Sequence, residues 1–449
     1  MITNDTELNA LMNESIRPKC TPRIQVQYID ENNNDLRRVF TEDNITSLTY
    51  KRGIDPIGRT LPYMELVWTE TNVEGTIEEN EPKSDDFKSL SLVSFDLTQY
   101  LDFGGEKKSY ITMNSLYLVG TPVVNGNEIV WTARDMMYFL NTNQEIGFQS
   151  GLKFTNPLRY FLLDERAEHK VNKYWEGFIR DLSLIQTYLK VNDTEDPLGT
   201  VIYQGETKNL LKDIVSTRNY FWDFGYAVDM ELKSFSDLLN QTEVVHTFHG
   251  NTMKKFPELT KNSNISAFNF VQHRVDIKTK ETYTIDTPTE VVEEMGATAN
   301  RFEFSDWGIV TATNTNSGFV PNTINKSVYT LNNDTKITVA PVSIINEDLF
   351  VNNNKVGETY SENNPCYFKE NNTKLEERMA LLNRYFNDNV YTMQFEGLPH
   401  FAIEPCDLVG VETDLTRNGE TVVKKGVVIE QELSYNGAWE QKMTVHEVK

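Results

Sequence analysis

The chain has 449 residues, a length that corresponds to roughly three domains of ordinary size. Aromatic residues make up 11% of it, too many for a disordered chain, and hydrophobic residues at 39% predict cores of modest size. With 43 Lys and Arg against 66 Asp and Glu, the net charge of −23 repels phosphates and anionic lipid headgroups. Composition therefore argues against nucleic-acid binding or membrane-surface binding through overall charge.

Cysteine usage and the N-terminus indicate the compartment. Cys20, Cys366 and Cys406 are odd in number and form no C-x-x-C arrangement, so neither a disulfide framework nor a structural zinc site is predicted. Residues 1–7 contain neither a basic region nor an apolar stretch, and no apolar run approaches the ~18 residues of a membrane span. We expect a protein made in a reducing cytoplasm, without membrane insertion.

The first 150 residues predict a β-rich region. Residues 23–28 alternate polar and apolar side chains, and a turn-forming run at 30–35 separates them from 36–40, which predicts a hairpin. Asp135 is expected to cap a short helix over 136–140. Turns are expected at 55–58 and 125–126, and an exposed acidic loop at 72–86, after which the strand pattern resumes from residue 90. Further strands are expected at 45–50, 63–69, 116–119 and 128–132.

The middle of the chain is expected to be richer in helix. Asn156 and Pro157 form a helix-start signal that is followed by helix formers to about residue 190. A second helix is expected over 207–220, with an apolar stripe, and a strand over 225–230. The stripe residues are Leu210, Leu211, Ile214 and Val215. Strand patterning returns from 244, for example at 328–331 and 336–339, and one helix over 374–386 interrupts it.

The sequence offers only weak local signals of a catalytic site or a metal site. His246 and His249 are three residues apart, a spacing that places them on opposite faces of a strand, so we interpret them as structural or surface histidines. The acidic pairs 164–165 and 293–294 are interpreted as solvated faces because sequence neighbours do not face each other. The turn 102–106 lacks the lysine and glycine spacing of a phosphate-binding loop.

No residue is therefore assigned a catalytic, cofactor-binding or metal-binding role, and no cofactor and no enzymatic activity are expected. No G-x-S-x-G motif is present, and the cysteines lack nucleophile signatures. The basic pairs Lys51–Arg52 and Lys424–Lys425 are isolated, and we interpret them as strand-edge charges that discourage unwanted pairing.

The C-terminal segment carries the most informative motifs. Residues 403–411 read IEPCDLVGV and residues 425–439 read KGVVIEQELSYNGAW. They resemble the closing β-barrel strands of bacteriophage tail hub proteins, the family of base-plate hubs and of the N-terminal part of tail-associated lysins. In that family an I-x-P-G-D-x-V turn precedes a strand, and a G-x-V-x-x-Q-x-L-x-[FY]-N-G-[AG] strand and turn follows. Here Cys406 stands in place of the glycine of the turn.

Other segments are similar to the same family. Residues 54–66, IDPIGRTLPYMEL, and 128–135, EIVWTARD, resemble its first barrel, and residues 207–230 resemble its helix and strand unit, with Ser236 and Asp237 at the exit. The physical roles of the motif residues are architectural. Asp407 is expected to bond turn amides, Gly426 and Gly437 to permit turn dihedrals, one strand face to carry Val427, Ile429, Gln431 and Leu433, and Tyr435 and Trp439 to supply packing area.

The resemblance implies a β-rich α+β protein with two barrel-like antiparallel β domains and a helical middle. The expected domains are residues 18–150, 151–243 and 244–449. It implies a structural subunit of the virion tail, a tail hub or base-plate hub. Identical copies would form a ring joining the tail tube to distal spike, fibre or receptor-binding proteins, with genome DNA passing through unbound. The net charge of −23 would then line the channel and repel DNA, or merely keep the subunit soluble.

Two functions from other classes remain open. A phage-associated carbohydrate-active hydrolase would need a deep cleft with two carboxyl groups ~5–10 Å apart. A monomeric receptor-binding adhesin would need an aromatic, carbohydrate-sized groove. The oligomeric state separates these alternatives from the hub, since only the hub requires a ring.

Overall fold

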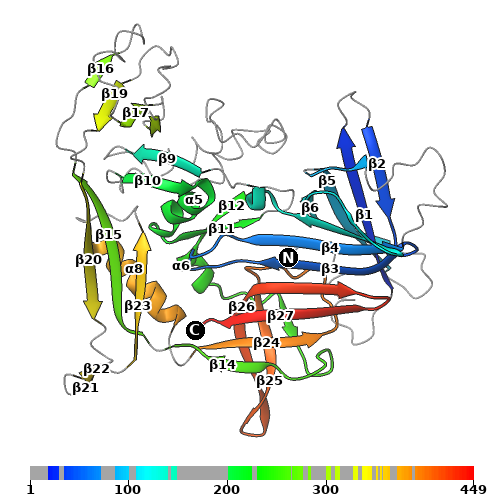
Figure 1. Cartoon of the computed structure of the whole chain (residues 1–449). Helices are drawn as coiled ribbons and strands as arrows, with labels where there is room; N and C mark the ends of the chain where they lie inside the picture. Colours follow the sequence, from blue (N-terminus) through cyan, green and yellow to red (C-terminus); the bar gives the residue numbers. More distant parts are fainter. Residues whose placement is uncertain are drawn as a thin grey trace.

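In the computed structural model, the described residues are 19–29, 35–71, 86–89, 91–100, 108–139, 143–148, 201–224, 230–263, 265–276, 282–284, 300–304, 309–313, 327–331, 336–345, 350–351, 354–355, 357–364, 372–386 and 390–449 (Figure 1). Several predictions fall outside them: the acidic loop up to residue 85, the helices over 157–190, the strand over 225–229, the turn at 102–106, the acidic pairs 164–165 and 293–294, and Cys366.

The largest sheet combines strands from both ends of the chain. Its strands are β1 (Cys20–Ile29), β2 (Asp35–Phe40), β3 (Ile45–Gly53), β4 (Tyr63–Thr71), β5 (Leu92–Tyr100), β6 (Lys108–Leu118), β7 (Val123–Asn125), β8 (Glu128–Arg134), β13 (His246–Phe248), β14 (Glu258–Lys261), β24 (Tyr391–Gly397), β25 (Leu408–Arg417), β26 (Glu420–Tyr435) and β27 (Trp439–Glu447). The order is β14-β24-β27-β26-β3-β4-β8-β6-β5-β1-β2, with β13, β25 and β7 beside this path.

Alternation of apolar and polar side chains explains the N-terminal strands. The predicted hairpin is confirmed, since β1 pairs antiparallel with β2, and Ile24 and Val26 are fully buried. Inward-facing aromatic rings form the centre of this core: Trp68 stacks on Trp131 with ring centroids 5.5 Å apart, and Phe40 meets both indoles edge-on. Such pairs add stability beyond the area they bury. Asp135 caps a short 3-10 helix, η2 (Met136–Phe139), as expected.

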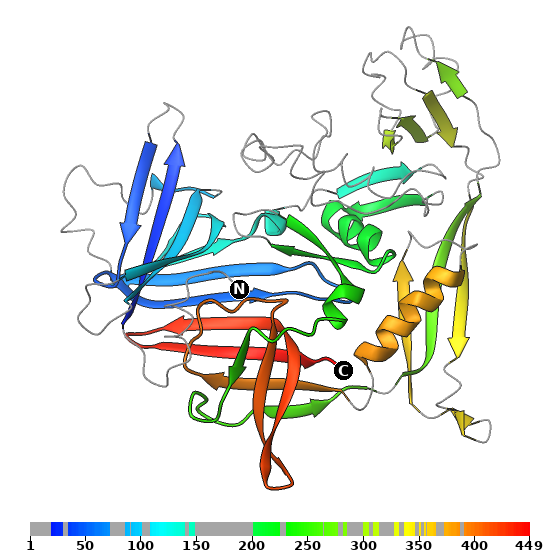
Figure 2. The same ribbon diagram turned by 180° about the vertical axis from the view of Figure 1, so that it is seen from behind.

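Strands β1 to β8 share one sheet with strands β13, β14 and β24 to β27, which come after residue 244. Residues 430–435 of β26 pair antiparallel with residues 48–53 of β3, and this pairing joins the C-terminal hairpin to the N-terminal strands (Figure 2). Among the described strands no pairing joins the end strands β14 and β2, so the sheet is not closed into a barrel there. The β-rich character is confirmed, while the three domain boundaries stay predictions.

Smaller sheets and three helices complete the described fold. The smaller strands are β9 (Asn143–Phe148), β10 (Val201–Glu206), β11 (Tyr220–Phe224), β12 (Met230–Ser234), β15 (Ile265–Asp276), β16 (Thr282–Thr284), β17 (Asn300–Phe304), β18 (Ile309–Thr313), β19 (Ser327–Leu331), β20 (Lys336–Ile345), β21 (Phe350–Val351), β22 (Asn354–Lys355) and β23 (Glu358–Asn364). The helices are α5 (Thr207–Ser216), α6 (Phe235–Leu239) and α8 (Asn372–Tyr385).

Helix α5 is shorter than predicted. Its four stripe residues are all buried, as expected, but the helix ends at Ser216 instead of Tyr220. Asn219 follows with a φ of 58°, a left-handed conformation that asparagine tolerates and that ends a helix. The chain then forms β11, which pairs with β12. Of the strand predicted over 225–230, only Met230 lies among the described residues, and it is the first residue of β12.

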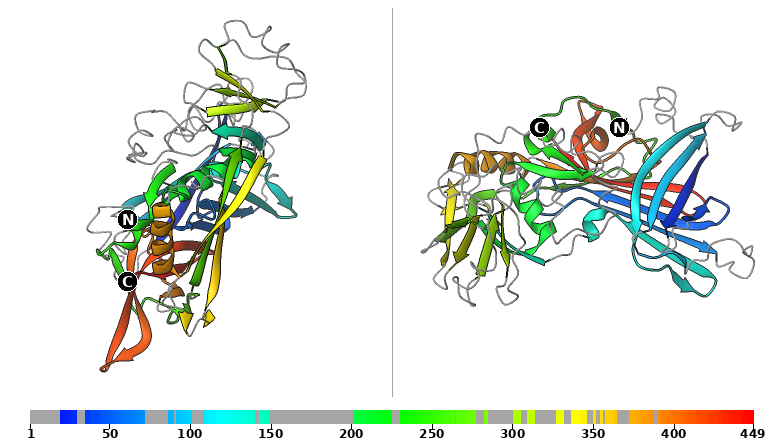
Figure 3. Two further views of the ribbon diagram at one scale, coloured as in Figure 1. Left: turned by 90° about the vertical axis from the view of Figure 1, so that its left-hand side faces the viewer. Right: turned by 90° about the horizontal axis from the view of Figure 1, so that it is seen from above.

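Helix α8 confirms the helix predicted over residues 374–386. Its buried Leu375, Leu382 and Tyr385 pack in one core with Phe235 of α6 and Phe268 of β15. Figure 3 shows α8 lying beside the long strands β15, β20 and β23, to one side of the large sheet. Within the described residues, no helix is long and apolar enough to span a membrane.

Candidate functional site

The hub-like turn near the C-terminus lies at a junction of three parts of the chain. Arg52 comes from β3, Asp223 from β11, and Glu404 from the turn that precedes β25. Arg52 and Asp223 are 171 residues apart in sequence, yet they meet inside the protein. We call Arg52, Asp223, Lys233 and Glu404 the buried ionic junction.

The junction is an extended ion-pair network. The Arg52 guanidinium lies 3.2 Å from the Asp223 carboxylate and 3.1 Å from Glu404. Lys233 Nζ approaches the other Asp223 oxygen to 2.7 Å. The Arg52 and Asp223 side chains are 4% and 0% exposed, so solvent does not screen them. Burial by itself would raise the pKa of Asp223, but the charges of Arg52 and Lys233 outweigh burial and hold that pKa below its usual value.

Cys406 occupies the glycine position of the family turn and adopts the glycine conformation. Its φ is 75°, in the left-handed region that favours glycine. The backbone N–H of Cys406 donates to the Val428 carbonyl at 2.9 Å, and its Sγ lies 3.6 Å from Asp223. Burial and the neighbouring Asp223 carboxylate raise the pKa of the Cys406 thiol, so it stays protonated. Cys406 therefore holds the turn in a conformation that glycine adopts more readily.

The other motif residues are placed largely as expected. Asp407 accepts a hydrogen bond from the backbone N–H of Glu404 at 3.0 Å, and Gly437 has a φ of 92° in the final turn. Trp439 Nε1 donates to the Cys20 carbonyl at 2.9 Å, which ties the last hairpin to the first strand. The expectation that Gly426 permits turn dihedrals is wrong, because Gly426 lies within β26 and pairs with Val409 and Glu447. A Cβ at Gly426 would lie 2.5 Å from the His446 carbonyl oxygen, so this position has no room for a side chain.

One detail of strand β26 differs from the prediction. A bulge lies between Val428 and Glu430, so strict alternation fails there. Val427 and Val428 are both buried, while Ile429 is only partly buried. Beyond the bulge, Gln431 and Leu433 return to the buried face as predicted. Bulges shift the side-chain pattern by one residue, and the sequence shows no signal for this one.

The interpretation of Lys51–Arg52 as strand-edge charges is wrong. Strand β3 lies between β26 and β4, so neither residue is at an edge. Lys51 pairs with Glu432 at 3.1 Å, and Arg52 is buried. A signal was present in the sequence, because Arg52 shares the strand face of Leu48 and Tyr50, which is a core face. Asp223 stands among apolar residues in the segment 221–224, which likewise indicates a buried position.

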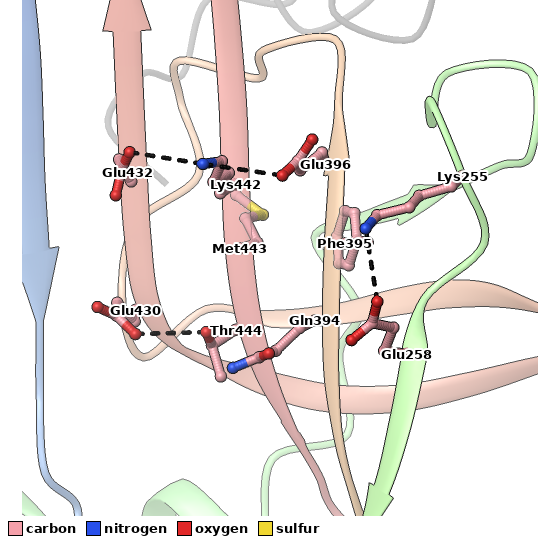
Figure 4. A pocket seen from close by; sticks show the side chains of 10 residues that line it. All are labelled: Lys255, Glu258, Gln394, Phe395, Glu396, Glu430, Glu432, Lys442, Met443 and Thr444. Atoms are coloured by element: carbon pink, nitrogen blue, oxygen red, sulfur yellow. Dashed lines mark hydrogen bonds and ion pairs between the residues drawn. The ribbon is translucent and has the colours of Figure 1, made fainter.

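The exposed face of the sheet carries one row of charges of alternating sign. Six residues lie directly opposite one another on successive strands: Glu396, Lys442, Glu432, Lys51, Glu65 and Arg134. Figure 4 shows Lys442 between Glu432 and Glu396, at 4.0 and 3.8 Å, on the floor of a shallow depression of about 220 Å³. Opposite charges facing each other stabilise a sheet. The row explains these carboxylates by pairing, without catalysis.

His246 and His249 lie in different surroundings. His246 is buried, with its ring 4.4 Å from that of His400, whereas His249 is exposed and lies 3.4 Å from Glu412. In the described part of the chain, no group of three His, Cys, Asp or Glu side chains is arranged to hold a metal ion. The weak acidic pairs discussed above lie outside the described residues.

Comparison with known proteins gives matches among solved structures only. No family model and no curated protein matches the sequence. The 43 kDa tail protein of prophage MuSo2 from Shewanella oneidensis is 10% identical, with a TM-score of 0.47, and the match covers 94% of this chain and 98% of that one. The tail protein from Neisseria meningitidis MC58 is 9% identical, with a TM-score of 0.48 and coverage of 95% and 96%.

A chain of the Francisella PdpA–VgrG complex is 8% identical, with a TM-score of 0.45, and the match covers 97% of this chain and 53% of that one. All three TM-scores lie below 0.5. The function proposed for this chain therefore rests on its own residues.

Proposed function

We propose that the chain is a structural subunit of a bacteriophage tail hub. Identical copies form a ring that joins the tail tube to a distal spike, fibre or receptor-binding protein. In this proposal the strands before residue 150 and those after 244 build two barrel-like units of the ring wall.

One observation carries the proposal: the hub-like segments meet in space. The turn at 403–411 and the strand at 425–439 come from one end of the chain, and the segment 54–66 from the other. Segment 54–66 contacts the strand at 425–439 directly, because the Ile54 N–H donates to the Ile429 carbonyl at 2.9 Å and the Tyr63 hydroxyl donates to Glu430 at 2.7 Å. The turn at 403–411 joins the same region through Glu404, which pairs with Arg52 of β3. Hub-like segments that contact one another through backbone and structural hydrogen bonds support an architectural function.

The experiment that tests the proposal is native mass spectrometry of the purified chain, combined with light scattering over a range of concentrations. A hub subunit gives a closed oligomer of one defined copy number. A chain that stays monomeric at every concentration contradicts the ring and favours the receptor-binding alternative.

Enzymatic activity is not part of the proposal. We expect no hydrolysis of peptidoglycan or of glycans by the purified chain, because the sequence carries no catalytic signature and the carboxylates of the charge row are paired with lysine and arginine. Turnover of cell walls that is abolished by changing one Asp or Glu would overturn this expectation and favour the hydrolase alternative.

The excess of acidic over basic residues would have a function in a ring through which DNA passes. An acidic wall repels the phosphate backbone, and the net charge of −23 supplies the charge for it. We propose that acidic residues line the axial face. An assembled structure with a neutral or basic axial face would contradict this part of the proposal and leave the structural role intact.

A further inference from the structure

A two-stranded arm projects from the body of the protein. It consists of residues 412–423, the distal halves of β25 and β26, joined by a turn at Asn418 and Gly419 with φ values of 56° and 85°. Figures 1 and 2 show this hairpin extending beyond all neighbouring strands. β13 accompanies β25 only from residue 409 to 411, and β27 accompanies β26 only from residue 426 onward.

The arm therefore exposes two strand edges. In the described part of the chain, residues 412, 416 and 417 pair only with residues 423, 421 and 420 of β26. The pairing is irregular at residues 413–415, where the Leu415 N–H donates to Thr413 Oγ1 at 3.3 Å. An isolated two-stranded hairpin is marginally stable in water, and its unpaired N–H and C=O groups offer a template for another strand. The arm also exposes aliphatic side chains, since Leu415 is 45% and Val423 47% exposed.

The far end of the large sheet offers a matching edge. Strand β2 is the last strand in the sheet order and pairs only with β1 among the described strands. Its exposed face presents Asp35, Arg37 and Val39, and Val39 is 41% exposed. Arg37 forms an ion pair with Asp35 at 2.6 Å. Because this pair is exposed to solvent, it holds Arg37 only weakly.

The two surfaces are complementary in chemistry. The arm combines aliphatic side chains with two exposed acids, Asp414 and Glu420, and one exposed base, Arg417, so acids are in excess. Strand β2 combines an aliphatic side chain with the exposed base Arg37 and its partner Asp35, and the adjacent Arg38 leaves bases in excess. Within one chain they cannot meet, because β3, β4, β8, β6, β5 and β1 lie between β26 and β2 in the sheet. A second copy of the chain removes this restriction.

We propose that the arm of one copy adds to the β2 edge of the next copy, by backbone pairing and by contact of Leu415 and Val423 with the Val39 region. This inference rests on the proposed ring. The contact joins two different surfaces, so repeating it around an axis closes a ring of identical contacts. Addition of a strand to an exposed sheet edge is a common mode of protein recognition.

The test compares association of full-length variants by light scattering and native mass spectrometry. Leu415→Asp with Val423→Asp alters the arm, and Val39→Asp alters the acceptor edge. Val123→Asp with Val124→Asp is the matched control, because these valines on β7 are 57% and 47% exposed but belong to neither surface. We expect the arm and β2 variants to weaken association at least tenfold and the control to associate like the original protein.

Crosslinking provides a second measurement that does not depend on weakened association. In a Cys366→Ser background, Val39→Cys combined with Leu415→Cys is treated with a short bismaleimide. The double variant should give a ladder of covalent oligomers, and each single variant should give none, because the contact joins unlike surfaces.

The outcomes separate the two proposals. If the original protein forms a ring and both the arm and β2 variants form it equally well, the arm inference is wrong while the hub proposal stands. If single-cysteine variants crosslink to dimers and the double variant gives no ladder, like surfaces meet and the arm inference is again wrong. If the original protein is monomeric at all concentrations, the ring itself is contradicted.

Discussion

Replacing Asp223 by asparagine should destabilise the protein strongly, because Asp223 is the only acidic member of the buried ionic junction that is completely buried. Its side chain is 0% exposed and lies between Arg52 at 3.2 Å and Lys233 at 2.7 Å. Breaking a buried ion pair typically costs about 3–5 kcal/mol, since the partner charge is left in a poorly solvated place. Arg52 would keep Glu404 at 3.1 Å, so we expect the lower end, about 3 kcal/mol.

Lys233 provides the internal comparison. Its side chain is 33% exposed, and Asp223 would still have Arg52, so Lys233→Met should cost only about 1 kcal/mol. Urea unfolding followed by tryptophan fluorescence measures both changes, and urea, unlike guanidinium, leaves ion pairs unscreened. Trp222 neighbours Asp223 in β11 and reports on this region.

The control is the exposed Lys254–Glu440 pair, whose substitution Glu440→Gln should leave the urea midpoint unchanged. Both substitutions replace an ion-paired carboxylate by the corresponding amide, so the comparison isolates burial. If Asp223→Asn shifts the midpoint no more than Glu440→Gln does, the junction does not hold the three parts of the chain together.

Three further predictions concern the C-terminal hairpin. Because Cys406 has a φ of 75°, Cys406→Gly should be more stable than Cys406→Ala by about 1 kcal/mol in urea unfolding; equal stability would refute backbone strain. A Cβ at Gly426 would meet the His446 backbone, whereas one at Gly53 would meet only the movable Tyr63 ring. Gly426→Ala should therefore lower the melting temperature more than Gly53→Ala, and the reverse order would contradict this reasoning. Burial lowers the pKa of His446 to about 4, so the neutral form is favoured in the fold. Between pH 6.5 and pH 4 the unfolded chain binds a proton that the folded chain does not, so stability falls by about 3 kcal/mol as the pH falls. The difference in unfolding free energy between the original protein and His446→Phe should follow this slope from pH 7 to pH 4, and a pH-independent difference would contradict it.

Local elements were largely predictable because their signals lie within a few residues. Alternation placed Ile24 and Val26 on the buried face of β1, and the apolar stripe of α5 is buried as a whole. The hub-like turn was also visible in the sequence, and the structure shows why cysteine is tolerated there: Cys406 adopts the left-handed conformation itself.

Elements whose ends depend on neighbours were less predictable. Helix α5 ends three residues before Asn219, where a left-handed residue redirects the chain into β11. The bulge at Ile429 likewise depends on the strand opposite it, because an extra residue is defined only relative to a partner.

The sequence by itself determined many local elements of this protein, such as the hairpin β1–β2 and the cores of helices α5 and α8, and the family that its C-terminal motifs resemble. Only the tertiary structure decided that β26 pairs with β3, that Arg52 meets Asp223 across 171 residues, and that the arm and β2 lie far apart. The physical reason is that alternation and turn residues act within a few positions along the chain. Pairing between distant strands is selected by the packing of the whole sheet, which no local pattern encodes.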